Sequence, residues 1–362
     1  MKVIYLLYPL FLFINIPSIY GFIRKPHNNI TPTYPNNKYL ILKSQLDPQP
    51  PQQSDNTIIK KVNSVLKLTR SVNVLPTLLL SFSGGFIVEP SLYNLLHSSA
   101  FISSSIISLL IMSLSMVLND IYDMGVDKIN NPDRPLITGE ISENEAYLLS
   151  FILLFLIEYL SIVYLHNDLQ KITNIALYGI AIYTPILKKM TFIKNLFCAV
   201  TVSFAMLYSG IAMHPDLYQW MQQHATTSNT YIIHYDILLI TMRYIFLGSL
   251  TTELLLDICD MEGDKSNDIK TLPVLFGKNV TFVFINGVLA YNIYNLLSLV
   301  KLINNNVVLV VAPIVLFLPM MIDMYKIKKS NYDKKIIDKT LKNMMIPMFL
   351  MLLYMCVLSH NV

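Results

Sequence analysis

Long apolar stretches follow one another along the chain, and short polar segments separate them. A helix needs roughly 20 residues to cross about 30 Å of hydrocarbon. The pattern therefore predicts about nine membrane-spanning helices. We expect them at residues 72–89, 98–119, 146–165, 172–187, 192–212, 232–256, 279–300, 306–325 and 343–359. The expected fold class is all-α, a polytopic membrane protein whose helices surround a central cavity.

The composition agrees with this pattern. Hydrophobic residues make up 54% of the 362 residues, charged residues make up only 14%, and the mean hydropathy is +0.50. A soluble domain of this length would carry more charge. A soluble terpene-type synthase, which also uses Asp-rich helices with Mg²⁺, is excluded because its helices need polar outer faces.

Basic residues collect on alternate loops, as they do on the cytoplasm-like face of membrane proteins. The net charge is +4, and most Lys and Arg residues precede the first span or follow the even-numbered spans. One face of the protein is therefore basic. These loops lie between hydrophobic helices and lack interleaved aromatic residues, so we expect no nucleic-acid partner.

The N-terminal residues differ from the rest of the chain. Residues 1–21 combine Lys2 with an apolar run too short to span a membrane, which is typical of a signal peptide. Residues 22–57 are basic and rich in Pro, Asn and Gln, and we expect disorder there. Together they resemble the bipartite presequences of plastids acquired by secondary endosymbiosis. The alternative is a signal anchor followed by a linker, and the transmembrane domain would occupy residues 58–362.

Two acidic clusters lie at the ends of predicted spans on the basic face. Residues four apart share one face of a helix, so Asn119, Asp123 and Asp127 form one stripe at the end of the second span. The segment DICDMEGD at the end of the sixth span places Asp257, Asp260 and Asp264 on a single face as well. We expect the two stripes to face each other across a common cavity.

Carboxylates that converge at a membrane boundary need cations to remain ionised. Asp and Asn oxygens are hard ligands that suit Mg²⁺, which also binds phosphate oxygens of substrates. Two such clusters predict a diphosphate site, with Arg134, Lys188 and Lys189 as nearby cations and Lys265 as a further contact. Loss of pyrophosphate from an allylic carbon would then leave a carbocation, which a water-poor pocket protects. We expect Phe197, Phe204, Met206 and Tyr208 to line that pocket.

These motifs resemble the UbiA superfamily of intramembrane prenyltransferases. The family motif NDxxDxxxD is matched at Asn119, Asp120, Asp123 and Asp127, and DICDMEGD matches the second acidic motif. The segments DKINNPDRPLITGEIS and TLPVLFGK are similar to the branch that contains geranylgeranylglyceryl phosphate, chlorophyll and homogentisate prenyltransferases. The resemblance covers about residues 60–360 and implies a nine-helix UbiA-like fold, Mg²⁺ as cofactor, and a prenyl diphosphate and a hydrophobic or aromatic acceptor as substrates.

The resemblance also implies roles for individual residues. Metal ligands would come from Asn119, Asp120, Asp123, Asp127, Asp257, Asp260 and Asp264, and Asp123, Asp127, Asp260 and Asp264 would be the catalytic acids. Asp120 could equally cap a helix. Substrate contacts would come from Arg70, Asn73, Arg134, Tyr183, Lys188, Asn195 and Lys265. Ser71 replaces the usual Pro of the first signature, and Lys194 stands where Gly usually precedes Asn195.

The main hypothesis is a Mg²⁺-dependent transfer of an isoprenyl group to a quinone-, tocopherol- or chlorophyll-type precursor within the membrane. Prenylation of geranylgeranylglyceryl phosphate is the alternative within the family. A membrane transporter with an acidic ion site is the alternative of another class, although transporter acids usually lie near mid-span. A catalytically silent homologue would be expected to lose one acidic stripe. The protein would be an integral membrane protein of a plastid or another endomembrane.

Overall fold

The computed structural model describes residues 54–216, 232–266, 269–299 and 307–361. The chain divides into two units, Met1–Lys60 and Lys61–Val362, and the second unit holds the helix bundle. Predicted segment 1–21 and nearly all of predicted segment 22–57 lie outside the described residues. The signal-peptide and presequence hypotheses, and the domain boundaries drawn from them, therefore stay predictions.

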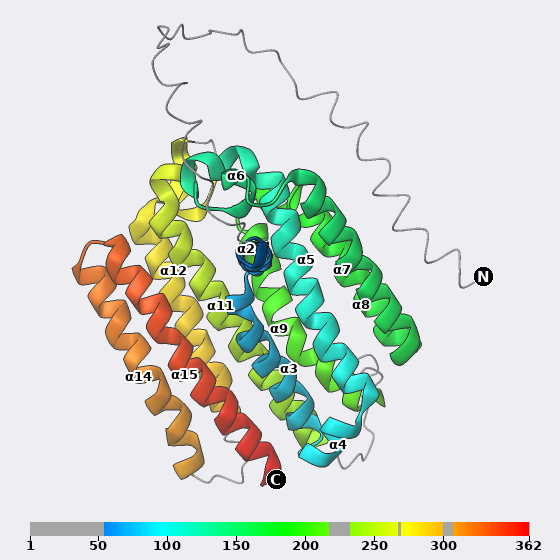
Figure 1. Ribbon diagram of the computed structural model, residues 1–362. Coiled ribbons are helices and arrows are strands. Elements are labelled where there is room, and N and C mark those ends of the chain that lie inside the picture. The colour runs from blue at the N-terminus through cyan, green and yellow to red at the C-terminus, as the bar shows by residue number, and fades with distance from the viewer. Residues whose placement is uncertain (1–53, 217–231, 267–268, 300–306, 362) are drawn as a thin grey trace, which may run out of the picture. The chain divides into compact units, whose positions relative to one another are not determined.

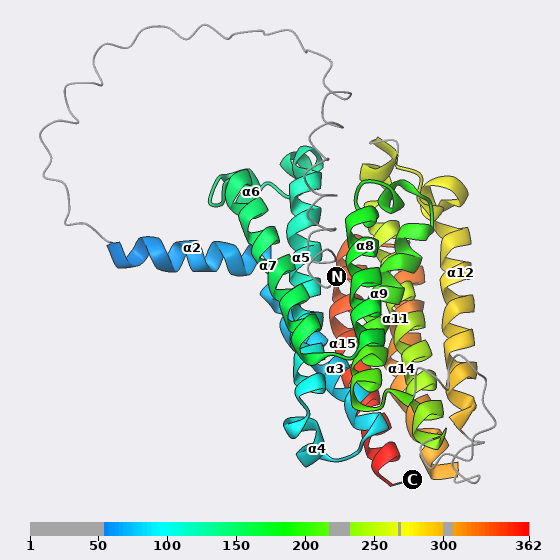
Figure 2. The same ribbon diagram turned by 90° about the vertical axis from the view of Figure 1, so that its right-hand side faces the viewer.

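Every regular element among the described residues is helical, which confirms the predicted fold class. The long helices of the bundle are α3 (Val74–Val88), α5 (Ser99–Asn130), α7 (Glu143–Tyr164), α8 (Asn167–Tyr183), α9 (Ile193–Met213), α11 (Ile232–Ser266), α12 (Leu272–Leu297), α14 (Val307–Lys329) and α15 (Lys334–His360). Shorter elements are α2 (Ser54–Leu68), η2 (Ser71–Asn73), α4 (Leu92–His97), α6 (Pro135–Thr138) and η3 (Leu187–Lys189). Figure 1 shows α7 and α8 at one side of the bundle and α14 at the other, and Figure 2 shows the long helices running along a common direction.

Seven helices among the described residues are long and apolar enough to cross a membrane, namely α3 with η2, α5, α7, α9, α11, α12 and α15. The predicted number of about nine is therefore a slight overstatement. Helix α8 has only 17 residues and begins with the polar sequence NDLQK. Helix α14 contains Pro313 and Pro319 and ends in charged residues. The protein is an integral, multi-pass membrane protein.

Helices α5 and α11 are the elements that position the acidic clusters. They contain 32 and 35 residues, and at about 1.5 Å per residue each is longer than the roughly 30 Å hydrocarbon core. Both acidic clusters are therefore helical, at the C-terminal ends of continuous helices. Ser98 caps the start of α5 by accepting a hydrogen bond from the Phe101 amide. The predicted spans ended too early because the acidic residues lower the local hydropathy.

Helix α9 packs closely against both α3 and α11. A Cβ atom added at Gly84 of α3 would lie 2.1 Å from the carbonyl oxygen of Met206 of α9, so only glycine allows this approach. Close packing fixes the position of α9 in the bundle. This matters for the site because the first residues of α9 contact the acidic cluster of α11.

Candidate active site

The first acidic motif is held by an arginine from the loop that follows it. Arg134 donates from Nη1 to Asp120 Oδ1 at 2.6 Å and to Asp127 Oδ2 at 2.5 Å. Both carboxylates are about 3% exposed. Pro135 begins α6 directly after Arg134, and proline suits the first position of a helix because its fixed φ angle is helical. The short helix α6 therefore turns the chain so that Arg134 points back at α5.

The remaining polar residues of this stripe contact the connection between α8 and α9. Lys188 of η3 forms an ion pair with Asp123. Thr184 donates its hydroxyl to Asn119 Oδ1 at 3.2 Å. Asn119 and Asp123 lie one helical turn apart on α5, and Thr184 and Lys188 are also four residues apart. The connection thus follows the acidic face of α5.

The second acidic motif is held by the start of α9. Asp257 of α11, which is 5% exposed, accepts from Lys194 Nζ at 2.7 Å and from Asn195 Nδ2 at 3.0 Å. Phe192 precedes α9 with a φ of 67°, in the left-handed region. A bulky residue rarely adopts this conformation. The backbone there is strained at the point where the chain turns to bring the next residues onto Asp257.

The segment of residues 184–195 therefore joins the two acidic motifs. Its first half contacts α5 through Thr184 and Lys188, and its last residues contact α11 through Lys194 and Asn195. The sequence predicted that both clusters open on one side of the membrane. The shared segment places them at the same end of the bundle, with lysines between them.

Asp260 and Asp264 occupy different surroundings from Asp257. Asp260 has a side chain that is 58% exposed and accepts from Lys334 Nζ of α15 at 3.3 Å. Asp264 Oδ2 is buried and has no hydrogen-bond partner among the described residues. Lys265 is exposed. The structure therefore brings Asp257 into contact with the α8–α9 connection and directs Asp260 toward α15.

Of the other predicted substrate contacts, Arg70 reaches an acidic residue, whereas Asn73 and Tyr183 contact other residues. Arg70, with a left-handed φ of 50°, reaches Asp120 Oδ1 at 3.4 Å. Asn73 is the residue before α3, and its carbonyl accepts from Thr77. The Tyr183 hydroxyl lies 3.2 Å from Cys198 Sγ, and its ring stacks on Phe197 at 4.9 Å. The side chain of Lys189 lies outside the described residues.

The predicted pocket-lining residues differ in burial. Met206 is fully buried and Tyr208 is 1% exposed, whereas Phe197 and Phe204 are half-buried. The Tyr208 hydroxyl lies 2.6 Å from the Thr173 hydroxyl of α8, and Phe204 stacks on the Tyr208 ring. Tyr208 is thus packed between α8 and α9. A role for these residues beside an isoprenoid chain stays a prediction.

The carboxylates are matched to cations of the chain itself. Across the described ranges, no three Asp, Glu, His or Cys side chains lie together as a ready metal site. Arg134, Lys188 and Lys194 instead neutralise four of the acids in ion pairs. Paired charges of this kind are needed where carboxylates are removed from water.

Sequence reasoning missed two of these contacts. Lys194 was noted only as a departure from the family pattern, and the structure shows that its side chain binds Asp257. The ion pair between Lys334 and Asp260 joins residues 74 positions apart. The unusual lysine marks a position of interest, but its partner Asp257 lies 63 positions away, so the sequence alone does not identify the pair. For Lys334 the sequence offers only a basic loop.

Comparisons with known proteins identify the family. The model of the UbiA prenyltransferase family matches residues 74–353. Digeranylgeranylglyceryl phosphate synthase of Saccharolobus solfataricus is 32% identical over 218 residues, which cover 60% of this chain and 70% of that protein. The corresponding synthase of Sulfolobus acidocaldarius is 30% identical over 239 residues, covering 64% and 76% of the two chains.

Solved structures share the fold. A UbiA homologue from Archaeoglobus fulgidus, bound to DMAPP and Mg²⁺, has a TM-score of 0.56 and 21% sequence identity, and the match covers 83% of this chain and 99% of that one. A UbiA homologue from Aeropyrum pernix K1 has a TM-score of 0.59 and 14% identity, with 76% and 95% covered. The family match removes the transporter alternative. The chain is a membrane prenyltransferase and belongs to the UbiA family.

Proposed function

We propose that this protein transfers a prenyl group from a prenyl diphosphate to the free hydroxyl of a glycerol phosphate ether lipid such as geranylgeranylglyceryl phosphate. The observation that carries the proposal is that the segment 184–195 joins both acidic motifs and brings Lys188 to Asp123 and Lys194 to Asp257. The names of the relatives support the acceptor. This proposal takes the alternative from the sequence analysis, prenylation of geranylgeranylglyceryl phosphate, in place of the quinone-, tocopherol- or chlorophyll-type acceptor of the main hypothesis.

The donor set fits Mg²⁺. Asn119, Asp123 and Asp127 present hard oxygens on one face of α5, and Asp264 Oδ2 is buried without a partner among the described residues. Asp260 adds an accessible carboxylate. When bound, Mg²⁺ would neutralise negative charge on the leaving diphosphate. The Archaeoglobus fulgidus homologue bound to DMAPP and Mg²⁺ supports this cofactor.

Asp120 and Asp257 act differently in our proposal. Each accepts from two donors of the chain, Asp120 from both arginines and Asp257 from Lys194 and Asn195. In Asp120 both donors reach the same oxygen, Oδ1, and in Asp257 each oxygen accepts one hydrogen bond. We assign them to holding the cations in place rather than to binding metal.

The cations have the reach and charge to bind the diphosphate. Arg134 offers a planar fork that suits phosphate oxygens, and Lys188 and Lys194 are point charges on flexible stems. In the reaction, the bond between the prenyl C1 and the diphosphate oxygen breaks and a bond from C1 to the acceptor oxygen forms. The diphosphate leaves with the bonding electron pair, and the proton of the acceptor hydroxyl passes to the released diphosphate. The fixed cations stabilise the charge that develops on this leaving group.

The test is an acceptor panel. The full chain in detergent is incubated with Mg²⁺ and geranylgeranyl diphosphate against geranylgeranylglyceryl phosphate, homogentisate, 4-hydroxybenzoate, 1,4-dihydroxy-2-naphthoate and chlorophyllide, with mass spectrometry of the products. Asp123→Asn is the inactive control, and Lys171→Gln is the matched control, because Lys171 pairs with Asp168 away from the acidic motifs. Prenylation of the glycerol phosphate acceptor alone supports the proposal. If an aromatic acceptor or chlorophyllide is prenylated instead, the proposed acceptor is wrong and the proposed prenyl transfer reaction stands.

A further inference from the structure

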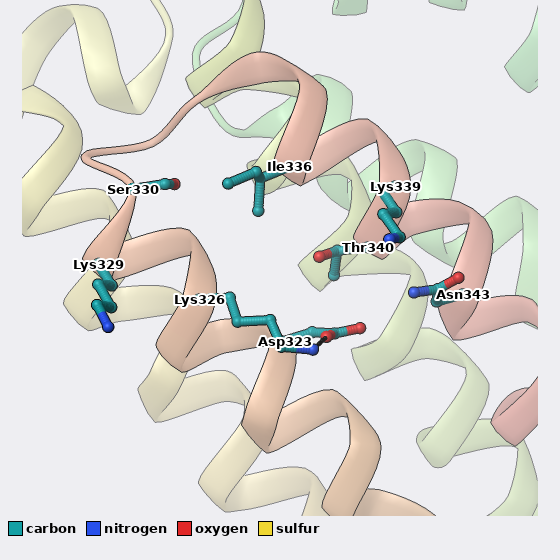
Figure 3. A pocket seen from close by; sticks show the side chains of 8 residues that line it. All are labelled: Asp323, Lys326, Lys329, Ser330, Ile336, Lys339, Thr340 and Asn343. Carbon is teal, nitrogen blue, oxygen red and sulfur yellow. Dashed lines mark hydrogen bonds and ion pairs between the residues drawn. The ribbon is translucent and has the colours of Figure 1, made fainter.

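A cavity lies between α14 and α15, apart from the residues assigned to prenyl transfer. Its volume is about 410 Å³, within the range of roughly 300–1,000 Å³ typical of ligand sites. The lining comes from the last turns of α14, the turn at Ser330 and the first turns of α15. The residues are Asp323, Lys326, Lys329, Ser330, Ile336, Lys339, Thr340 and Asn343. Figure 3 shows Lys326 extending from α14 toward α15, and Lys339 and Thr340 on the opposite side.

The charge of this cavity is positive. Three lysines line it against one carboxylate, that of Asp323, which is 7% exposed. Asp323 Oδ1 accepts from Lys326 Nζ at 2.8 Å. Within the described ranges, the ammonium groups of Lys329 and Lys339 have neither a hydrogen-bond nor an ion-pair partner. Two lysines without such a partner therefore line the cavity, Lys329 on the α14 side and Lys339 on the α15 side.

The surroundings of the cavity indicate where that anion comes from. Lys334, just before the α15 residues that line the cavity, contacts Asp260, so the cavity lies at the same end of the bundle as the acidic motifs. Along the same helices, away from the charged end, Val315, Leu318 and Leu353 are 48–52% exposed. Exposed apolar side chains of a helix bundle in a membrane face lipid tails. A molecule with a charged head and an apolar tail matches both surfaces.

We propose that the cavity between α14 and α15 binds the phosphate of an anionic membrane lipid, with the lipid tail along the exposed apolar faces of these helices. Basic pockets between transmembrane helices bind anionic lipid headgroups in this way. The hydroxyl of Thr340 and the amide of Asn343 offer neutral hydrogen-bonding groups for the phosphate and the glycerol oxygens, whereas the Ser330 hydroxyl already donates to the Ile327 carbonyl. The inference does not depend on prenyl transfer, because none of these residues is assigned to that reaction.

The experiment measures lipid binding with native mass spectrometry of the full chain in detergent. The probes are phosphatidylglycerol, phosphatidylcholine and inorganic phosphate, each titrated separately. The test variant is K329Q/K339Q, because neither ammonium holds another described side chain in place. The matched control is K335Q/K342Q, which removes two exposed lysines of α15 that do not line the cavity. Thermal unfolding of each variant shows whether the bundle remains folded.

We expect phosphatidylglycerol to bind the parent protein more tightly than phosphatidylcholine. The K329Q/K339Q variant should lose about 30-fold in affinity, which corresponds to about 1 kcal/mol per lysine near a membrane surface. The K335Q/K342Q variant should change less than about threefold. Equal loss in both variants, or no preference for the anionic lipid, would overturn the proposal. The protein could instead bind inorganic phosphate through Lys329 and Lys339 and fail to bind phosphatidylglycerol. That result would assign the cavity to a free anion and would also overturn the proposal of a lipid site.

Discussion

Arg134 forms ion pairs with two carboxylates of the candidate site, so we develop the prediction for its substitution first. Its guanidinium bridges Asp120 and Asp127, whose side chains are 3% and 5% exposed, while Arg134 itself is 23% exposed. Hydrogen bonds to charged groups contribute about 1.5–3 kcal/mol each. Removing one partner of a buried ion pair costs about 3–5 kcal/mol. Partial exposure of the arginine lowers the figure, and we expect Arg134→Gln to cost about 3 kcal/mol.

The assay is thermal unfolding in detergent, followed with a thiol-reactive dye that reports exposure of the three cysteines of the chain. At about 2–4 °C per kcal/mol, Arg134→Gln should lower the Tm by roughly 6–12 °C. Lys171→Gln breaks an exposed pair at 2.9 Å and should change the Tm by less than about 1 °C. Added Mg²⁺ should raise the Tm of Arg134→Gln more than that of the parent, because the uncovered carboxylate of Asp127 can bind the cation.

An unchanged Tm in Arg134→Gln would refute this reasoning, since two buried carboxylates cannot lose their shared cation without a cost unless they bind a proton or another cation. A lowered Tm with no additional response to Mg²⁺ would keep the structural role of Arg134. It would remove Asp127 from the proposed magnesium ligands.

Three further predictions concern the second motif, the helix packing and the metal. Lys194→Met should raise the KM for the prenyl diphosphate about tenfold or more in steady-state assays, because the cation beside Asp257 is lost; an unchanged KM would remove Lys194 from the diphosphate site. Gly84→Ala should destabilise the bundle by about 3 kcal/mol, because the new Cβ would meet the Met206 carbonyl, whereas Gly248→Ala meets no atom within 4 Å and should be nearly neutral in thermal unfolding. Chelation with EDTA should abolish product formation, and Mg²⁺ should restore it; turnover that persists in EDTA would contradict the proposed cofactor.

The fold and the acidic motifs could be predicted from the sequence because both depend on local patterns. Hydropathy identifies the spans, and the spacing of Asn119, Asp123 and Asp127 places them on one helical face. The number of spans was slightly too high, because hydropathy does not register the shortness of α8. The predicted ends of the second and sixth spans came too early, at residues 119 and 256, whereas α5 ends at Asn130 and α11 at Ser266. The acidic residues lower the local hydropathy although the helix continues through them.

The pairing of acids with cations could not be predicted from the same patterns. Asp257 and Lys194 are 63 residues apart, and Asp123 and Lys188 are 65 apart, so their contact depends on how helices pack around α9. Helix packing in turn rests on small residues such as Gly84, whose importance appears only when the neighbouring backbone is known. A sequence gives candidate charges on one face of the membrane, and the tertiary structure decides which of them meet.

The ion pairs of the site also bear on how a diphosphate enters it. Several carboxylates at a membrane boundary repel one another, and Arg134, Lys188 and Lys194 remove that repulsion in the folded chain. The same three cations are the ones that suit a diphosphate. Binding of a metal–diphosphate complex would therefore exchange partners, with carboxylates turning to the metal and cations turning to the phosphate oxygens. Such an exchange would keep every charge paired. The carboxylates and cations already lose contact with water when the chain folds, so substrate binding would not have to provide the free energy of their desolvation.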